Sequence, residues 1–138
     1  MRTAEFNQAM SGREGAYQPS TFPTPPFPEY PSGHSTFSAA GAEILRRWTH
    51  SDNFGASVTF PVGSSVIEPG LTPAESITLY WATFTDAANQ AGISRRYGGI
   101  HFETGDLVGR VTGRLVGTQA WKKAVSYFRG AARKDSEP

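Results

Sequence analysis

The chain of 138 residues contains no cysteine. This absence excludes structural disulfides, thiolate metal sites and a cysteine nucleophile. It also means that cysteine usage does not indicate whether the protein works in a reducing or an oxidising compartment. No apolar run approaches the ~18 residues of a membrane-spanning helix, and the first residues lack the apolar core of a secretory signal. The net charge of +1 provides no basic field for nucleic acid or an acidic membrane. We therefore expect a soluble protein of unknown compartment, with a length that suits one domain.

The N-terminal part of the chain is dense in proline between Pro19 and Pro31. Residues 1–21 are typical of an irregular segment, and residues 22–28 should run extended because proline restricts φ. A disordered linker and a docked approach strand both fit this composition, and the interspersed aromatic residues favour docking. Residues 131–138 are typical of a polar tail. The expected domain, a partial one, spans residues 22–130.

Apolar residues recur at helical spacing over residues 36–49, 72–92 and 104–129. Ser32 or Ser35 can cap the first helix, whose first turn then presents free N–H groups. A capping box from Thr72 to Glu75 marks the start of the second helix, and Gly92 marks its end. The pattern predicts an all-α helical bundle whose loops carry the chemistry.

Two short runs between the first two helices, residues 57–60 and 65–67, are typical of strands. They lie in a stretch rich in glycine and serine, residues 50–71. This stretch predicts either one short β-hairpin or an ordered loop.

The last helix carries a stripe of glycines spaced four apart: Gly105, Gly109, Gly113 and Gly117. A glycine inside a helix costs ~1 kcal/mol relative to alanine. The stripe therefore predicts close contact with another helix, because glycine lets two backbones approach. The alternative is a weak helix that frays.

Ser32, Gly33 and His34 place a hydroxyl, an unhindered backbone N–H and an imidazole at the expected start of the first helix. Serine and glycine are also ordinary capping residues, so the tripeptide alone leaves its function open. A helix N-terminus gathers free N–H donors and positive dipole, which makes it an anion site. An imidazole there can exchange protons with an oxyanion near neutral pH.

A guanidinium and a second imidazole follow at Arg95 and His101. Arginine binds oxyanions in a planar, two-pronged manner, and the glycines at residues 98–99 permit a tight turn that aims both side chains at one point. The alternative is a surface arginine and a structural histidine. Arg96 is expected to face solvent, although either arginine could point inward.

Charged residues after His101 are candidates for a supporting role. Asp106 could accept a hydrogen bond from the second ring nitrogen of His101 and set its tautomer, or it could be a first-turn aspartate favoured by the helix dipole. Glu103 has a weaker claim of the same kind. Arg110 and Arg114 are interpreted as surface or interface charges.

The tetrapeptide Pro-Ser-Gly-His at residues 31–34, followed by Ser-Arg at residues 94–95 and by His101, resembles the second and third signature motifs of the vanadium haloperoxidase and type 2 phosphatidic acid phosphatase superfamily. The strings at residues 25–35 and 97–102 resemble its soluble, bacterial haloperoxidase-like branch in particular. The resemblance covers residues 22–130 and implies a helical bundle of the haloperoxidase and acid phosphatase type.

By this resemblance, Ser32 and Gly33 would hydrogen-bond a bound oxyanion, His34 would be the acid–base residue, and Arg95 would bind equatorial oxygens. His101 would be the axial ligand of the metal in vanadate, or the phosphorylated nucleophile of a phosphatase. The implied cofactor is vanadate, and phosphate can occupy the same site because both are oxyanions. The implied substrates are hydrogen peroxide and a halide, which the activated peroxide oxidises to a hypohalous equivalent.

Two departures from the family's pattern bear on function. The third motif commonly has an aspartate four residues after the histidine, where this chain has Gly105, one place before Asp106. The first motif, a lysine followed seven residues later by Arg-Pro, is missing: the first lysine is Lys122, and neither Arg2 nor Arg13 precedes a proline. Without those cations the affinity for a multiply charged anion should be low, and we expect a C-terminal portion of a longer protein.

Three functions fit these motifs. The leading one is a vanadate-dependent haloperoxidase, and the second is a soluble acid phosphatase that acts on a phosphate ester through a phosphohistidine. The third is an inactive fragment that folds by docking, either as a homo-oligomer or onto a missing upstream half. A fragment should expose large apolar faces, here those around Phe37, Trp48, Trp81 and Trp121. The lack of spanning helices argues against a membrane lipid phosphatase.

Overall fold

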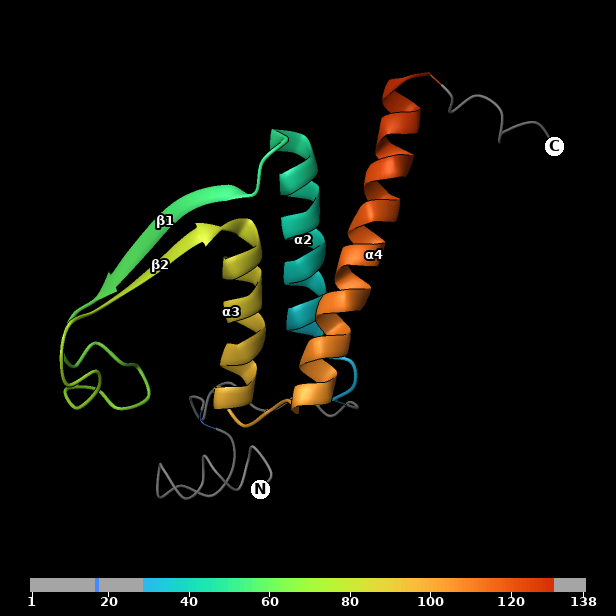
Figure 1. Ribbon diagram of the computed structural model, residues 1–138. Coiled ribbons are helices and arrows are strands. Elements are labelled where there is room, and N and C mark those ends of the chain that lie inside the picture. Colours follow the sequence, from blue (N-terminus) through green and yellow to red (C-terminus); the bar gives the residue numbers. More distant parts are fainter. Residues whose placement is uncertain (1–16, 18–28, 131–138) are drawn as a thin grey trace.

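The computed structural model describes residue 17 and residues 29–130. Within these residues the helices α2 (Gly33–Thr49), α3 (Phe84–Tyr97) and α4 (Glu103–Phe128) lie side by side, and the strands β1 (Asn53–Phe60) and β2 (Ile77–Thr83) form an antiparallel ribbon (Figure 1). The helix α2 packs against both of the others. The expected helical bundle with one hairpin is confirmed. None of these helices is long and apolar enough to cross a membrane.

The predicted segments at the two ends of the chain, residues 1–21 and 131–138, lie outside the described residues, as does the proline-rich stretch 22–28. Tyr17 is the exception. Its N–H donates to the carbonyl of Gly98 at 2.9 Å, and its hydroxyl donates to Glu68 at 2.7 Å.

The helix α2 begins where the sequence predicted a cap. Of the two candidates, Ser32 is the N-cap, and its Oγ accepts a hydrogen bond from the N–H of Ser35 at 3.3 Å. At the other end His50 adopts the left-handed conformation with φ 54°, and its N–H donates to the carbonyl of Arg46. The predicted helix over residues 36–49 is confirmed, with its start three residues earlier.

The predicted helix over residues 72–92 is wrong in its first half. Residues 77–83 form β2, which pairs with β1 in a register that places Ile77 opposite Phe60 and Tyr80 opposite Ser57. Six of these seven residues, all but Ala82, are β-branched, aromatic or leucine, a composition that suits a pleated strand once a partner strand is available. The predicted strand over residues 57–60 lies in β1, whereas residues 65–67 belong to the loop between the strands.

The helix α3 starts at a capping box that lies further along than the one predicted at Thr72. The hydroxyl of Thr83 accepts from the N–H of Asp86 at 2.9 Å, and the Asp86 carboxylate accepts from the N–H of Thr83 at 3.1 Å. The helix then continues through Gly92, which is buried, and ends at Tyr97. The predicted stop at Gly92 is therefore wrong, and α3 carries the arginines in its last turn.

Three glycines of the α4 stripe, Gly109, Gly113 and Gly117, pack against the backbone of α2 and its cap. A Cβ atom at Gly113 would lie 2.1 Å from the carbonyl oxygen of Thr36, and one at Gly117 would lie 2.7 Å from that of Ala40. Real Cβ atoms essentially never come within 3.0 Å of another heavy atom, so this approach requires glycine. The prediction of close helix–helix contact is confirmed, and the fraying alternative is wrong.

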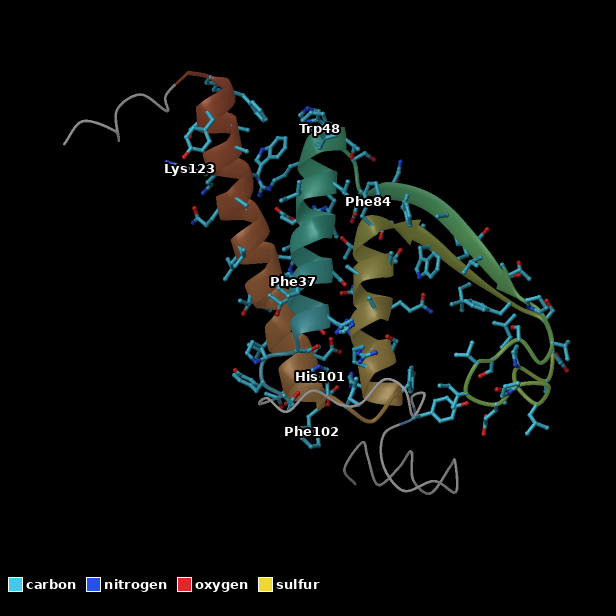
Figure 2. The ribbon with its side chains drawn as sticks, turned by 180° about the vertical axis from the view of Figure 1, so that it is seen from behind. Phe37, Trp48, Phe84, His101, Phe102 and Lys123 are labelled. Carbon is cyan, nitrogen blue, oxygen red and sulfur yellow. The ribbon has the colours of Figure 1, made fainter. Side chains whose placement is uncertain are left out.

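The interior of the described part is built from small and polar side chains. Its buried apolar residues are Ala39, Ala42 and Ala88, and its fully buried side chains of largest volume are Asp106, Ser32 and Ser35. Large apolar side chains lie outside: Phe37 is 80% exposed and Trp48 is 66% exposed, and Figure 2 shows both on α2. The predicted exposure is confirmed for these two, whereas Trp81 and Trp121 are half-buried.

Candidate oxyanion site

Three element ends meet at one end of the bundle: the first turns of α2 and α4 and the last turn of α3 (Figure 1). Because α3 runs in the direction opposite to its two neighbours, residues 32–34, 95 and 101 come to the same end although they lie far apart in the sequence. The first turn of α2 adds N–H groups without intrahelical partners and the positive end of its dipole.

His34, Arg95 and His101 share one electrostatic environment. Partial burial lowers the pKa of His34, and the positive charges of Arg95 and then of His101 lower it further. Because both motifs lie at this end of the bundle, Arg95 and His101 are close enough to act on the His34 imidazole. His34 is only partly enclosed and keeps an exposed surface, while His101 is 8% exposed, which leaves the first imidazole accessible from solvent and encloses the second.

Arg95 carries a buried donor. Its Nε atom is shielded from solvent and has no hydrogen-bond partner within the part of the chain that the structure describes, and burial lowers the pKa of the guanidinium. Buried polar groups are nearly always paired. An unpaired guanidinium nitrogen close to two imidazoles is a donor that an anion would satisfy.

The start of α2 offers room as well as donors. A Cβ atom at Gly33 would meet nothing within 4 Å, so the space beside this first helical residue is open. Together with Arg95, His34 and His101, this opening fits a tetrahedral or bipyramidal oxyanion such as phosphate or vanadate. What this arrangement offers an anion is positive charge and hydrogen-bond donors.

Ser32 holds the start of α2 in place. Its Oγ accepts from the N–H of Ser35 and lies 3.0 Å from the hydroxyl of the same residue, and its own N–H donates to the carbonyl of Gly105 at 3.0 Å. Ser32 is fully buried. In this structure its hydroxyl caps the helix, and its contact with an oxyanion stays a prediction.

The partner of His101 is a residue that the sequence did not single out. Nδ1 of His101 lies 2.8 Å from Oε2 of Glu29, and the same oxygen accepts from the N–H of Phe102 at 3.3 Å. The position of His101 between the ends of the helices is visible in Figure 2. Glu29 lies three residues before Ser32, and a carboxylate this close to the motif was the one signal that could have identified it.

Asp106 does not take the role predicted for it beside His101. Its buried carboxylate accepts from Arg110 Nε at 2.7 Å, from Arg110 Nη2 at 2.6 Å and from the hydroxyl of Ser35 at 2.8 Å, with Arg96 at 3.7 Å. Burial alone would raise the pKa of Asp106, but the hydrogen bonds from Arg110 and Ser35 and the charges of Arg110 and Arg96 lower it overall. The carboxylate therefore joins α2, α3 and α4.

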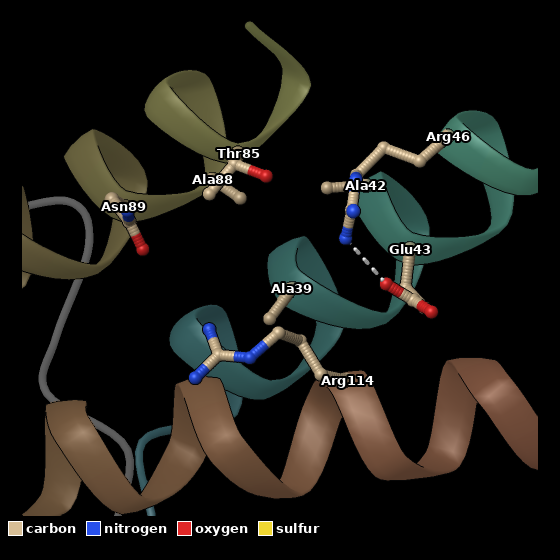
Figure 3. A pocket seen from close by; sticks show the side chains of 8 residues that line it. All are labelled: Ala39, Ala42, Glu43, Arg46, Thr85, Ala88, Asn89 and Arg114. Atoms are coloured by element: carbon tan, nitrogen blue, oxygen red, sulfur yellow. Dashed lines mark hydrogen bonds and ion pairs between the residues drawn. The ribbon is translucent and has the colours of Figure 1, made fainter. Parts of the chain in front are cut away.

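The other charged candidates are accounted for by the packing. Arg96 was expected to face solvent, but its Nη2 donates to Glu103 at 2.9 Å and its side chain is 26% exposed. Arg110 lies in the helix interface through Asp106. Arg114 lines a cavity of about 10 Å³ between the three helices, near the ion pair of Arg46 with Glu43 (Figure 3).

Comparison with known proteins identifies the protein family to which the chain belongs. The chain matches the family described as the VCPO second helical-bundle domain over residues 4–130, and it belongs to this family. The predicted membership of the haloperoxidase superfamily is confirmed. No curated protein matches the chain.

Solved structures similar to the chain include the following three. The apo-type and holo-type bacterial vanadium-dependent chloroperoxidase structures are each 34% identical, with TM-scores of 0.67 and 0.66. A structure described as the first bacterial vanadium-dependent iodoperoxidase is 38% identical, with a TM-score of 0.50. Each match covers 73% of this chain and 22% of the other, so the chain spans less than a quarter of the length of these proteins.

Proposed function

We propose that this chain supplies the histidine and arginine ligands of a vanadate site in a vanadium-dependent haloperoxidase, an oxidoreductase that uses hydrogen peroxide to oxidise a halide. The observation that carries the proposal is the cluster of His34, Arg95 and His101, in which the buried Nε of Arg95 has no partner among the described residues. The similarity to bacterial chloroperoxidase and iodoperoxidase structures supports it.

Each residue of the cluster has a distinct task in this proposal. Ser32 and Gly33 would donate hydrogen bonds to the oxyanion, Arg95 would neutralise its charge, and His101 would hold it through a ring nitrogen. When bound, vanadate would activate hydrogen peroxide toward attack by halide without a redox change at the metal. His34 would move the proton, because its lowered pKa favours the neutral imidazole, the form that can act as a base.

The lysine and Arg-Pro cations of the family's first motif do not occur in this sequence. We therefore expect weak vanadate binding by the chain alone. A polypeptide that carries those cations should raise the affinity when it is added, because they neutralise charge that Arg95 cannot balance by itself.

The test is a titration of the purified chain with vanadate, followed by vanadium NMR. His101→Ala should abolish the signal of bound vanadate. His50→Asn is the matched control: it also removes an imidazole, at the opposite end of α2, and asparagine tolerates the left-handed conformation found there. Circular dichroism checks that each variant is folded.

Two results would overturn the proposal. One is a folded chain that binds no vanadate even with the missing cations supplied, and the other is binding that survives His101→Ala. Hydrolysis of a phenyl phosphate in the absence of vanadate, abolished by His101→Ala, would replace the haloperoxidase with an acid phosphatase.

A further inference from the structure

We infer that Glu29 is the positioning residue that fixes the ring orientation and tautomer of His101, and that residue 105 is glycine because the Glu29 carboxylate occupies the space beside it. The inference rests on the proposed function, in which His101 presents one ring nitrogen to the oxyanion. It assigns to Glu29 the task that the sequence had suggested for Asp106.

The first observation is the double use of one carboxylate oxygen. Oε2 of Glu29 lies 2.8 Å from Nδ1 of His101 and 3.3 Å from the backbone nitrogen of Phe102. An ionised carboxylate only accepts hydrogen bonds, so Nδ1 must carry the hydrogen of this contact. In the neutral ring Nε2 is then left with its lone pair, which is the form that a metal ligand or a nucleophile needs.

The second observation is the lack of space at residue 105. A Cβ atom on Gly105 would lie 2.4 Å from Oε2, 2.7 Å from Oε1 and 2.9 Å from Cδ of Glu29. The other glycines of the stripe face the backbone of α2, whereas this one faces a side chain. The family's third motif commonly has an aspartate at this place, and here the carboxylate beside the turn comes from Glu29 instead.

The third observation is that Gly105 cannot easily move away. Its carbonyl accepts a hydrogen bond from the N–H of Ser32 at 3.0 Å, which ties the start of α4 to the cap of α2. Glu29 lies three residues before Ser32, so the same short segment caps one helix and reaches across to His101. A side chain at residue 105 should therefore displace the carboxylate of Glu29.

The remaining carboxylates near this turn already have other partners. Glu103 pairs with Arg96 at 2.9 Å, and Asp106 is held by Arg110 and by the hydroxyl of Ser35. Glu29 is thus the carboxylate that the described part of the chain offers to His101.

The experiment is nitrogen NMR of the full 138-residue chain labelled with ¹⁵N-histidine, recorded without vanadate at a pH at which His101 is neutral. The chain has three histidines, and the signals of His101 are those lost in His101→Ala. In the unmodified chain we expect a protonated Nδ1 and an unprotonated Nε2. Glu29→Ala should move the hydrogen toward Nε2, whereas Glu29→Gln, which keeps an acceptor oxygen, should preserve the original tautomer.

Gly105→Ala provides an independent route to the same result, because it leaves Glu29 in the sequence and removes only its space. We expect the His101 signals of this variant to resemble those of Glu29→Ala. Glu103→Ala is the matched control, since it removes a carboxylate from the same turn that does not bind the ring, and it should leave the signals unchanged.

The inference is overturned if Glu29→Ala and Gly105→Ala, or whichever of them folds, leave the His101 signals as they were. It is also overturned if Glu103→Ala shifts them equally. A vanadate titration separates the two proposals: Glu29→Ala should weaken binding by about 10–100-fold, the usual effect of losing such a partner. Correct tautomers with no vanadate binding at all would instead refute the proposed function alone.

Discussion

Gly113→Ala tests the packing of α4 against α2 most directly. The added Cβ would lie 2.1 Å from the carbonyl oxygen of Thr36 and 2.9 Å from Cβ of Ala39. To restore the 3.0 Å that real Cβ atoms keep, the helices must shift apart by about 0.9 Å at this point. Because the obstructing atom belongs to the backbone, no side-chain rotation can relieve the contact.

The magnitude follows from two opposing effects. Overpacking of this kind costs about 1–3 kcal/mol, and the severity of this contact places it near the upper limit. Alanine in place of a helical glycine stabilises the helix by about 1 kcal/mol because of its higher helix propensity. We therefore expect Gly113→Ala to lower the free energy of unfolding by about 2 kcal/mol.

The matched control is Gly41→Ala, in the exposed middle of α2. A Cβ there meets nothing within 4 Å, so only the helix propensity changes, and the free energy of unfolding should rise by about 0.5–1 kcal/mol. Urea unfolding followed by circular dichroism measures both values. If Gly113→Ala stabilised the chain as Gly41→Ala does, the close approach of the two helices would be refuted.

Three further predictions concern charge and capping. Asp106→Asn should lower the free energy of unfolding at pH 7 by about 3 kcal/mol, because it leaves the largely enclosed guanidinium of Arg110 without its anion. Folding lowers the pKa of Asp106. The stability that its ionised carboxylate adds is therefore fully present above its pKa in the unfolded chain, and it is lost as the pH falls through its pKa in the folded chain. The acid unfolding curves of the original chain and of Asp106→Asn should converge at that pH. Thr83→Ala should cost about 1 kcal/mol by removing the cap shared with Asp86, measured as a lower melting temperature. The NMR titration midpoint of His34, lowered by burial and by its cationic neighbours, should rise when phosphate binds. No rise at saturating phosphate would contradict the proposed anion site.

The helices at either end of the described chain were predictable because their signals are local. Ser32 caps α2 as the sequence suggested, and the four-residue spacing of Gly113 and Gly117 identified the face that meets α2. Such features depend on residues that are close together in the sequence, so they form regardless of the structure of the rest of the chain.

The region before α3 could not be predicted in this way. Residues 77–83 have an apolar spacing that fits a helix and a composition that fits a strand, and pairing with β1, some twenty residues away, decides between them. The capping box of Thr83 and Asp86 is present in the sequence, but aspartate in place of glutamate made it less visible than the one at Thr72.

The residues that gather at this end of the bundle could be predicted from the sequence, whereas their hydrogen-bond partners could not. The convergence of His34, Arg95 and His101 followed from the motifs, whereas the pairing of His101 with Glu29 depends on how the segment before α2 crosses the start of α4. The spacing of residues in the sequence does not reveal how that segment crosses α4. The sequence therefore favoured Asp106, which is nearer than Glu29 to His101 along the chain.

The small and polar interior has a consequence for temperature. Exposure of apolar surface raises the heat capacity on unfolding, and exposure of polar surface lowers it. With alanines as the buried apolar residues of the described part, and with an aspartate and two serines as its largest fully enclosed side chains, the heat-capacity change should be small for the length of the chain. Its stability should therefore vary over a flatter curve between cold and warm conditions than that of a domain built around leucine and phenylalanine.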